Sequence, residues 1–177
     1  MNKSSVSQGQ AGLELLLWNA EAESVASGDL YIWLRESGLP SEISIRLKTL
    51  IEITAEFADH VINIGKVVLL KIIDFIKEHP NLAIGVALGV AIGLLTGAIP
   101  LVGPILAPIA AALGIAVGAV GGHRLDKQAK GQHLSLGVDP ISVSLDIIEI
   151  AKAFFKLLID TINAVAKALS LRLTRNG

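Results

Sequence analysis

The chain has 177 residues, of which 52% are hydrophobic and only 18% are charged, and its net charge is −1. This balance favours one domain of a membrane-associated class and argues against nucleic acid as a partner. The absence of cysteine excludes disulfides and thiolate chemistry. The first ten residues contain one lysine and no apolar core, so we expect synthesis in the cytosol without a cleavable signal peptide.

Residues 1–40 predict a polar start followed by two short amphipathic helices. Between residues 10 and 27, leucines alternate with glutamates, which is typical of an amphipathic helix. Asp29 can cap a second helix, and a Gly-Leu-Pro sequence at residues 38–40 closes it. The aromatic side chains of this segment form a candidate surface for a protein partner, and they are Trp18, Tyr31 and Trp33.

Residues 41–79 predict one long helix that begins with Ser41 as its N-cap and stops before Pro80. Polar residues along it recur at steps of three and four, so at helical pitch they form one narrow stripe on an otherwise apolar cylinder. The central members of this stripe are Glu52, Glu56, Asp59, Asn63 and Lys66. Such an apolar helix needs a covering partner in water.

The central stretch, residues 81–122, carries no charged side chain. Each of its two apolar runs approaches the ~20 residues that an α-helix needs to cross a bilayer core. Proline and glycine interrupt the stretch near its middle, which predicts a turn at Pro100, Gly103 and Pro104. We therefore expect a hydrophobic, membrane-inserting (transmembrane) helical hairpin.

Small residues recur at every fourth position in both apolar runs, a pattern called a glycine zipper. At helical pitch each set forms a smooth face that a second backbone can approach closely. Interior glycines cost about 1 kcal/mol each relative to alanine, so lipid or close packing must offset them. The alternative is a glycine-rich hairpin buried at the centre of a soluble bundle. The residues expected to pack in this way are Gly85, Gly89, Gly93, Gly97, Ala110, Gly114, Gly118 and Gly122.

After the hairpin, residues 123–138 predict a polar connector and residues 139–172 a second long amphipathic helix, with Asp139 as its cap and Pro140 at its first position. If the hairpin turns back on itself, the two long helices run antiparallel beside each other. Lysine and arginine flank only the base of the hairpin, so we expect this base on the cytoplasmic side. The polar residues of the second helix form another stripe, which includes Glu149, Lys152, Lys156, Asp160 and Asn163.

No residue pattern of an enzyme, a cofactor site or a metal site emerges, so we expect none of them. The four histidines lack a spacing that would put two of them beside a carboxylate on one helix face. No glycine-rich phosphate loop follows a predicted strand. His79 and His123 border the uncharged stretch and are candidates for a pH switch of insertion. The alternative is that both are interfacial histidines without a switching role.

The two polar stripes admit two interpretations. In a soluble bundle they are the solvent faces, whereas in an oligomer they line an aqueous lumen while the wide apolar faces meet lipid or neighbouring subunits. Both interpretations hold for a chain that is stored in one state and inserted in another. The hairpin favours this two-state interpretation because it requires a membrane.

An uncharged helical hairpin enclosed by amphipathic helices resembles the pore-forming domains of colicin-type bacteriocins and, more loosely, other α-helical pore-forming toxins and membrane-depolarising effectors. The residues that carry the resemblance are Leu82 to Gly97 and Ile105 to Gly122. This sequence differs in placing its hairpin near the middle of the chain and in its denser glycine zippers. The resemblance implies membrane permeabilisation and transfers no individual residue role.

The sequence thus predicts an all-α protein, with residues 1–40 as an N-terminal segment and residues 41–177 as a membrane-active domain in which long amphipathic helices flank a glycine-zipper hairpin. Its expected function is to insert into a lipid bilayer, form a homo-oligomer and open a pore, as a bacterial toxin or defence effector. Two alternatives remain open. One is a hairpin protein that scaffolds or curves a membrane, and the other is a membrane-anchored adaptor whose N-terminal helices bind a protein partner.

Overall fold

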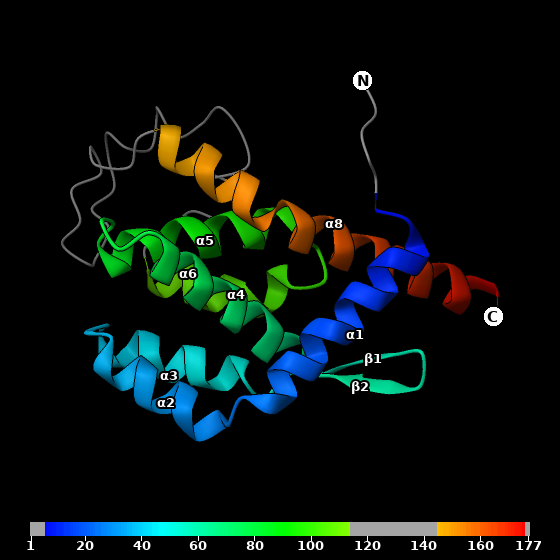
Figure 1. Ribbon diagram of the computed structural model, residues 1–177, viewed down its shortest axis with the longest axis horizontal. Helices are drawn as coiled ribbons and strands as arrows, with labels where there is room; N and C mark the ends of the chain where they lie inside the picture. Colours follow the sequence, from blue (N-terminus) through cyan, green and yellow to red (C-terminus); the bar gives the residue numbers. More distant parts are fainter. Residues whose placement is uncertain (1–5, 114–144, 176–177) are drawn as a thin grey trace.

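The computed structural model describes residues 6–113 and 145–175, and these parts of the chain are mostly helical (Figure 1). The prediction of a mostly helical protein is confirmed. A short antiparallel strand pair, which the sequence pattern did not predict, lies between two of the helices. In chain order the elements are α1 (Gln8–Ser24), α2 (Ser27–Glu36), α3 (Ser41–Leu50), β1 (Ala55–Phe57), β2 (His60–Ile62), α4 (Ile64–Glu78), α5 (Ile84–Ala98), α6 (Gly103–Ala112) and α8 (Leu145–Arg175).

The N-terminal helices α1 and α2 form where the sequence predicts them. Ser7 and Gln10 form a capping box at the start of α1, in which each side chain binds the backbone of the other. The extended backbone of Val25 and Ala26 then separates α1 from α2. The prediction that Asp29 caps α2 is wrong, because the helix begins two residues earlier with Ala26 as its N-cap. Asp29 lies in the first turn of α2, where its carboxylate complements the positive end of the helix dipole.

The prediction of one continuous helix over residues 41–79 is wrong, because residues 51–63 leave helical conformation. Here β1 pairs with β2, with Glu56 opposite Val61 and Phe57 opposite His60. Ala58 and Asp59 connect the strands with positive φ angles of 49° and 63°, as a two-residue type I′ turn requires. The polar spacing that indicated a helical stripe therefore spans a helix, a hairpin and a second helix.

Gly65 explains why the chain turns back so tightly after the hairpin. Its N–H donates a hydrogen bond to the carbonyl of Ile53 at 3.1 Å, so the start of α4 lies against the end of α3. A Cβ atom at this position would lie only 1.8 Å from the carbonyl oxygen of Leu50. Only glycine allows this approach of two backbones, which sets the crossing of α3 and α4.

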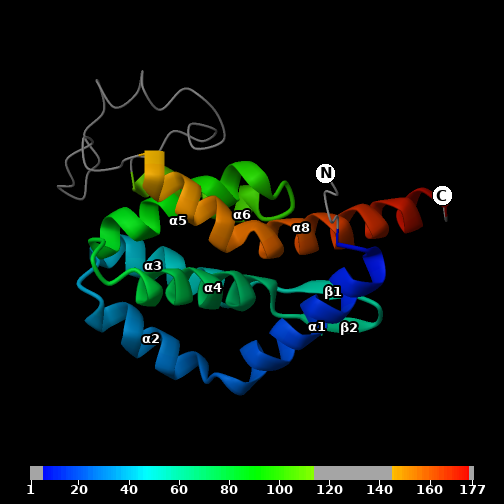
Figure 2. The same cartoon turned by 45° about the horizontal axis from the view of Figure 1, so that its top comes forward.

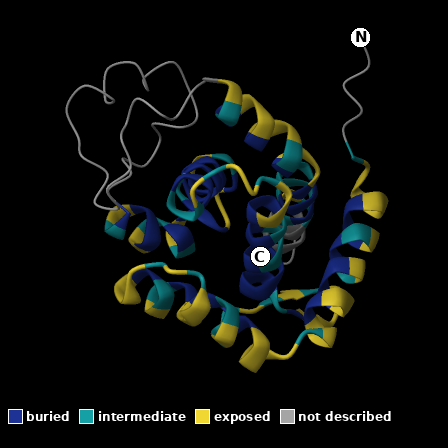
Figure 3. Ribbon diagram, turned by 60° about the vertical axis from the view of Figure 1, so that its left-hand side comes forward, coloured by how far each residue is buried: buried dark blue, intermediate teal, exposed yellow. Residues whose placement is uncertain are grey.

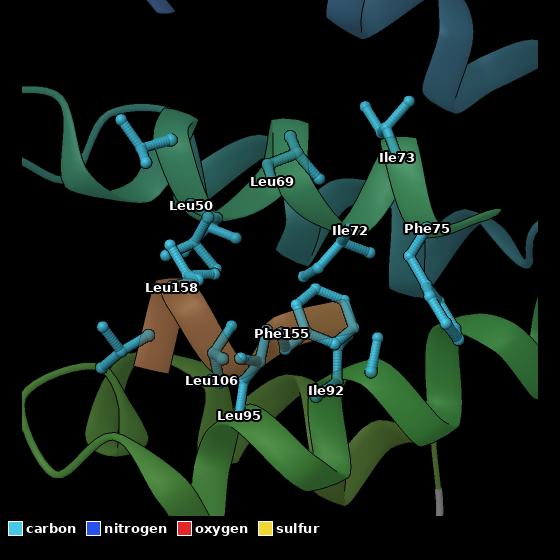
Figure 4. Packing of buried hydrophobic residues seen from close by; sticks show 14 of the residues in the cluster. Leu50, Leu69, Ile72, Ile73, Phe75, Ile92, Leu95, Leu106, Phe155 and Leu158 are labelled. Carbon is cyan, nitrogen blue, oxygen red and sulfur yellow. The ribbon is translucent and has the colours of Figure 1, made fainter. Parts of the chain in front are cut away.

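Helix α4 lies at the centre of the fold and packs against α1, α3, α5 and α8. Ten of its fifteen residues are buried, which is why its sequence is apolar nearly all round. Ile72 of α4, Phe155 of α8 and Ile92 of α5 approach one another in the middle of the core (Figure 4). Figure 3 colours the helices by burial, and it shows that the buried residues of each helix face the centre of the bundle while the exposed residues face outward.

The helices form layers around this core. Figure 2 shows α5, α6 and α8 together, with α3 and α4 on one side of them and α2 beyond, while α1 runs from the α2 end toward the C-terminal half of α8. The second predicted long helix corresponds to α8, whose described part begins at Leu145. Its predicted capping residues lie outside the described residues. Its buried apolar side chains recur at helical spacing, and they are Ile148, Ala151, Phe155, Leu158, Ile162 and Val165.

Candidate functional site

The candidate site is the uncharged hairpin formed by α5 and α6. The two helices pack against each other, and they are covered by α3, α4 and α8. Ten of the fifteen residues of α5 are buried. Among the described helices, none combines the length and the apolar character that crossing a membrane requires. The hairpin in this structure is therefore an inner element of a helical bundle, sheltered by the apolar faces of its neighbours.

The turn between α5 and α6 lies at the predicted place. Pro100 is exposed between the two helices, and Pro104 occupies the first turn of α6, where a missing N–H is tolerated. The N–H of Gly103 donates to the carbonyl of Ile99 at 2.8 Å. A Cβ atom on Gly103 would lie 2.9 Å from the carbonyl oxygen of Thr96. Glycine at position 103 therefore lets the start of α6 approach the end of α5.

The residues of the first glycine zipper have unequal surroundings. Gly93 is buried, and Gly85 and Gly89 are half-buried. Gly97 is exposed, and a Cβ atom there would meet nothing within 4 Å, so the expectation of close packing is wrong for this position in this structure. The reason is that Gly97 lies in the last turn of α5 on a face that none of the described helices covers. Of the second zipper, Ala110 is buried, and the remaining predicted residues, Gly114, Gly118 and Gly122, lie outside the described residues.

Helix α8 packs against α4 through aromatic side chains and contacts the end of α5 through one hydrogen bond. Phe155 of α8 is fully buried, with its ring centre 5.2 Å from that of Phe75 on α4, and Phe154 meets the same ring edge-on at 5.3 Å. The side-chain amide of Asn163 donates to the carbonyl of Ala98 at 2.9 Å. This bond satisfies a carbonyl in the last turn of α5, where the helix itself supplies no partner.

His79 lies at the end of α4, beside the aromatic contacts of α8. Its Nδ1 atom lies 2.8 Å from the carbonyl oxygen of Phe75, and its ring centre lies 4.5 Å from the Phe75 ring and 6.3 Å from the Phe154 ring. The other proposed switch residue, His123, lies outside the described residues. The structure therefore gives His79 a defined environment, and it does not test the proposed pair.

The stripe predicted over residues 52–66 does not form one face. Glu52, Glu56 and Asp59 are exposed, and they lie after α3, on β1 and in the hairpin turn. Lys66 is 7% exposed, so the prediction that it faces solvent or a lumen is wrong. Its ammonium group donates to the carbonyl of Val25 at the C-terminal end of α1.

Asn63 also turns toward α1. The Asn63 N–H donates to Oδ1 of Asn19 at 2.8 Å, and its side-chain amide donates to the same atom at 3.1 Å. The side-chain amide of Asn19 donates in turn to the carbonyl of Val61 at 3.3 Å. Further along α4, the Lys71 ammonium lies 5.2 Å from the centre of the Trp18 ring. The polar residues near the start of α4 therefore contact α1.

The stripe on α8 does lie at the surface over its first part. Glu149, Lys152 and Lys156 are exposed, whereas Asp160 and Asn163 are half-buried. Glu149 forms an ion pair with Lys152 at 3.1 Å, and Lys156 forms one with Asp160. Ion pairs between exposed side chains contribute little to stability. These residues therefore serve mainly to solvate the outer face of α8.

Two buried polar side chains, Asn19 and Thr161, were not singled out by the sequence analysis. Asn19 falls at helical spacing among the buried residues Leu15 and Ala22 of α1, which marks it as a polar side chain on an apolar face. Thr161 of α8 is fully buried, and its hydroxyl has no hydrogen-bond partner among the residues that the structure describes. The hydroxyl of Thr96 on α5, by contrast, donates to the carbonyl of Ile92.

The aromatic side chains of the N-terminal helices are engaged within the molecule. Trp18 is buried beneath Lys71, and the Lys48 ammonium lies 4.7 Å from the centre of the Tyr31 ring. Trp33 is half-buried against the core. Within the described parts of the chain, no three histidine, aspartate or glutamate side chains come together as metal ligands would.

The chain matches no protein-family model, and comparison with the curated proteins and with the solved structures found no similar protein. The uncharged hairpin and the helices that cover it are therefore the basis on which a function is argued.

Proposed function

We propose that this protein inserts its uncharged hairpin into a lipid bilayer, forms a homo-oligomer there and makes the membrane permeable to ions or small solutes. In this proposal it acts at a membrane as a bacterial toxin or defence effector. The observation that carries the proposal is that residues 81–113, which include all of α5 and α6, contain no charged side chain and pack beneath amphipathic helices. Such a segment can exchange its protein neighbours for lipid without burying a charge.

The covering helices support a change between a closed and an inserted state. The face of α8 that lies on α5 is apolar, and its opposite face carries ion pairs at the surface. A helix of this kind can keep its charged face in water while its apolar face meets lipid in place of the core. The closed bundle and the inserted hairpin therefore bury the same apolar surface in two different environments.

The experiment that tests this proposal links α5 to α8 and asks whether permeabilisation stops. The substitutions Ala98→Cys and Asn163→Cys place two thiols where one side chain already contacts the other backbone at 2.9 Å. The chain has no cysteine of its own, so only this pair can oxidise. We measure dye release from anionic liposomes for the oxidised and the reduced protein. We expect release only after reduction, because α5 must leave α8 to enter the bilayer.

The matched control is a second cysteine pair, Glu56→Cys with Val61→Cys, at facing positions of β1 and β2. Both of these positions are exposed and distant in sequence from the hairpin of α5 and α6. Oxidation of this pair should leave dye release unchanged. Equal release by the oxidised and reduced forms of the α5–α8 pair would contradict hairpin insertion, and a wild-type protein that binds liposomes without releasing dye would contradict permeabilisation.

A further inference from the structure

We propose that α1 holds the bundle closed as a detachable helix, and that its release from α4 precedes the exposure of the hairpin; the link to insertion rests on the proposed function. The inference comes from the α1–α4 polar contact, which we define as Asn19 and the Val25 carbonyl on the α1 side, with Asn63 and Lys66 on the α4 side. These four residues join segments that are more than forty positions apart in the sequence.

The α1–α4 polar contact specifies where α1 docks. Oδ1 of Asn19 accepts both the backbone and the side-chain amide hydrogens of Asn63, and the Asn19 amide reaches the carbonyl of Val61 and the carboxylate of Glu23. Asn19 is itself buried, and these hydrogen bonds satisfy its side-chain amide, as a buried polar group requires. A register shift of α1 along α4 would leave several of these groups without partners.

Lys66 makes this docking reversible. Its buried ammonium donates to the carbonyl at the C-cap of α1, where the helix dipole is negative. Within the part of the chain that the structure describes, no carboxylate forms an ion pair with Lys66. A buried charge with a carbonyl as its counterpart regains its hydration when α1 leaves, and the Asn19 and Asn63 amides can bind water in the same way. Separation of α1 from α4 is therefore less costly than separation of two apolar helices.

Release of α1 affects the hairpin through α8. Helix α1 packs against α8 as well as α4, and α8 covers α5. Figure 2 shows this order, with α1 crossing the C-terminal half of α8 and the N-terminal half of α8 lying over α5. When α1 is docked, α8 is held between α1 and the core. When α1 leaves, α8 is held only by its packing on α5, by the aromatic contacts of Phe155 and Phe154 with Phe75 of α4, and by the Asn163 bond to Ala98, among the described contacts.

A cysteine pair replacing the two asparagines tests this inference in both directions. In Asn19→Cys with Asn63→Cys, oxidation fixes α1 to the start of α4, and reduction leaves neither asparagine bond in place. We measure amide hydrogen exchange of each helix without lipid, and the rate of dye release from anionic liposomes. We expect reduction to speed exchange in α1 by at least about tenfold while α5 stays protected, because the lost hydrogen bonds belong to α1. Dye release should be faster than wild type when reduced and slower when oxidised.

Leu47→Ala is the control for a general loss of stability. Leu47 is fully buried in α3 and takes no part in the α1–α4 polar contact, so its truncation should destabilise the whole bundle without selectively freeing α1. Simultaneous exchange of α1 and α5 in the wild type and in the reduced pair would overturn the inference. So would faster exchange of α1 with an unchanged rate of dye release. If the wild type and every variant release no dye, the proposed function is wrong, while the exchange data still decide whether α1 detaches separately.

Discussion

Polar groups inside the bundle differ in how well they are satisfied, and this difference has measurable consequences. Asn19 has hydrogen-bond partners on α1, on β2 and at the N-cap of α4, whereas the buried hydroxyl of Thr161 has none in the described parts of the chain. An unsatisfied buried hydroxyl destabilises the folded state because it has lost its water without gaining a protein partner. Thr161 is therefore a position where a substitution can stabilise the closed bundle.

Thr161→Val should raise the free energy of unfolding by about 1–2 kcal/mol, because valine keeps the shape and removes the unpaired hydroxyl. Urea denaturation followed by circular dichroism measures this change. Thr96→Val is the matched control, since the Thr96 hydroxyl donates to the carbonyl of Ile92. That substitution should leave stability unchanged or lower it. A loss of stability in Thr161→Val would show that the Thr161 hydroxyl contributes a favourable contact.

Gly65→Ala should lower the free energy of unfolding by about 1–3 kcal/mol or more, as expected for overpacking. The added methyl group would overlap the carbonyl of Leu50, which belongs to the backbone and cannot rotate away. Gly28→Ala provides the comparison, because a Cβ atom there meets nothing within 4 Å. Denaturant midpoints should fall for the first variant and stay level or rise slightly for the second. Equal midpoints would exclude the proposed role of Gly65 in the crossing of α3 and α4.

Among the elements, the β1–β2 hairpin decides how the chain turns from α3 into α4. Phe57 on β1 lies against Gly12 of α1, where a Cβ atom would come within 3.2 Å of the ring. The hairpin is therefore packed against α1 on one side, and its turn extends outward, with Ala58 exposed. Both turn residues, Ala58 and Asp59, have positive φ angles. This conformation is unfavourable for Ala58, since the Cβ of alanine clashes with the backbone in it.

Ala58→Gly should stabilise the protein by about 0.5–1 kcal/mol, because glycine adopts the positive φ angle without the clash. Ala55→Gly at the start of β1 is the control, since Ala55 has an extended backbone there and glycine loses more conformational freedom on folding than alanine does. Thermal unfolding followed by circular dichroism should give a higher midpoint for the first variant and a lower one for the second. A lower midpoint for both would show that the turn is not strained at Ala58.

At the scale of the whole molecule, the glycine zippers have separate roles in the closed bundle and in the proposed oligomer. A substitution at Gly97 can distinguish these two roles, because Gly97 is exposed in the closed bundle and a Cβ atom there would meet nothing within 4 Å. Gly97→Leu should therefore fold as the wild type does, with a small gain in helix propensity. If helices in the membrane pack along the zipper face, the leucine blocks their close approach.

We expect Gly97→Leu to bind liposomes as the wild type does and to release dye at least about tenfold more slowly, equivalent to about 1.4 kcal/mol of lost association energy. Co-sedimentation with liposomes measures binding, and dye release measures permeabilisation. Ala111→Leu adds the same side chain at an exposed position of α6 that lies off the zipper face, and it should leave both quantities unchanged. Normal dye release by Gly97→Leu would contradict assembly through this face.

Local patterns determined several elements correctly. The start and stop signals near Ser41 and Pro80 bounded the segment that contains α3 and α4, although Pro40 and not the predicted Ser41 is the N-cap of α3, and the apolar spacing of α8 predicted its buried face. These boundaries were predictable because proline restricts the backbone beside it, and the buried face because a helix must turn one face to the core. The same spacing failed at residues 51–63, since Glu56, Asp59 and Asn63 are separated by steps that suit a helix while their backbone is paired as a hairpin.

The sequence by itself determined that residues 81–122 are uncharged, that amphipathic helices flank this segment, and that a turn divides it near Pro100. Only the tertiary structure decided that Gly65 lies on the backbone of Leu50, that Lys66 faces the end of α1 and that Gly97 faces open space. The physical reason is that residue spacing defines faces relative to a helix axis, whereas the neighbour of each face depends on long-range packing. Helix α1 therefore appeared as a separate segment in the sequence, and in the folded protein it contacts Asn63, Lys66 and Lys71 at the start and middle of α4.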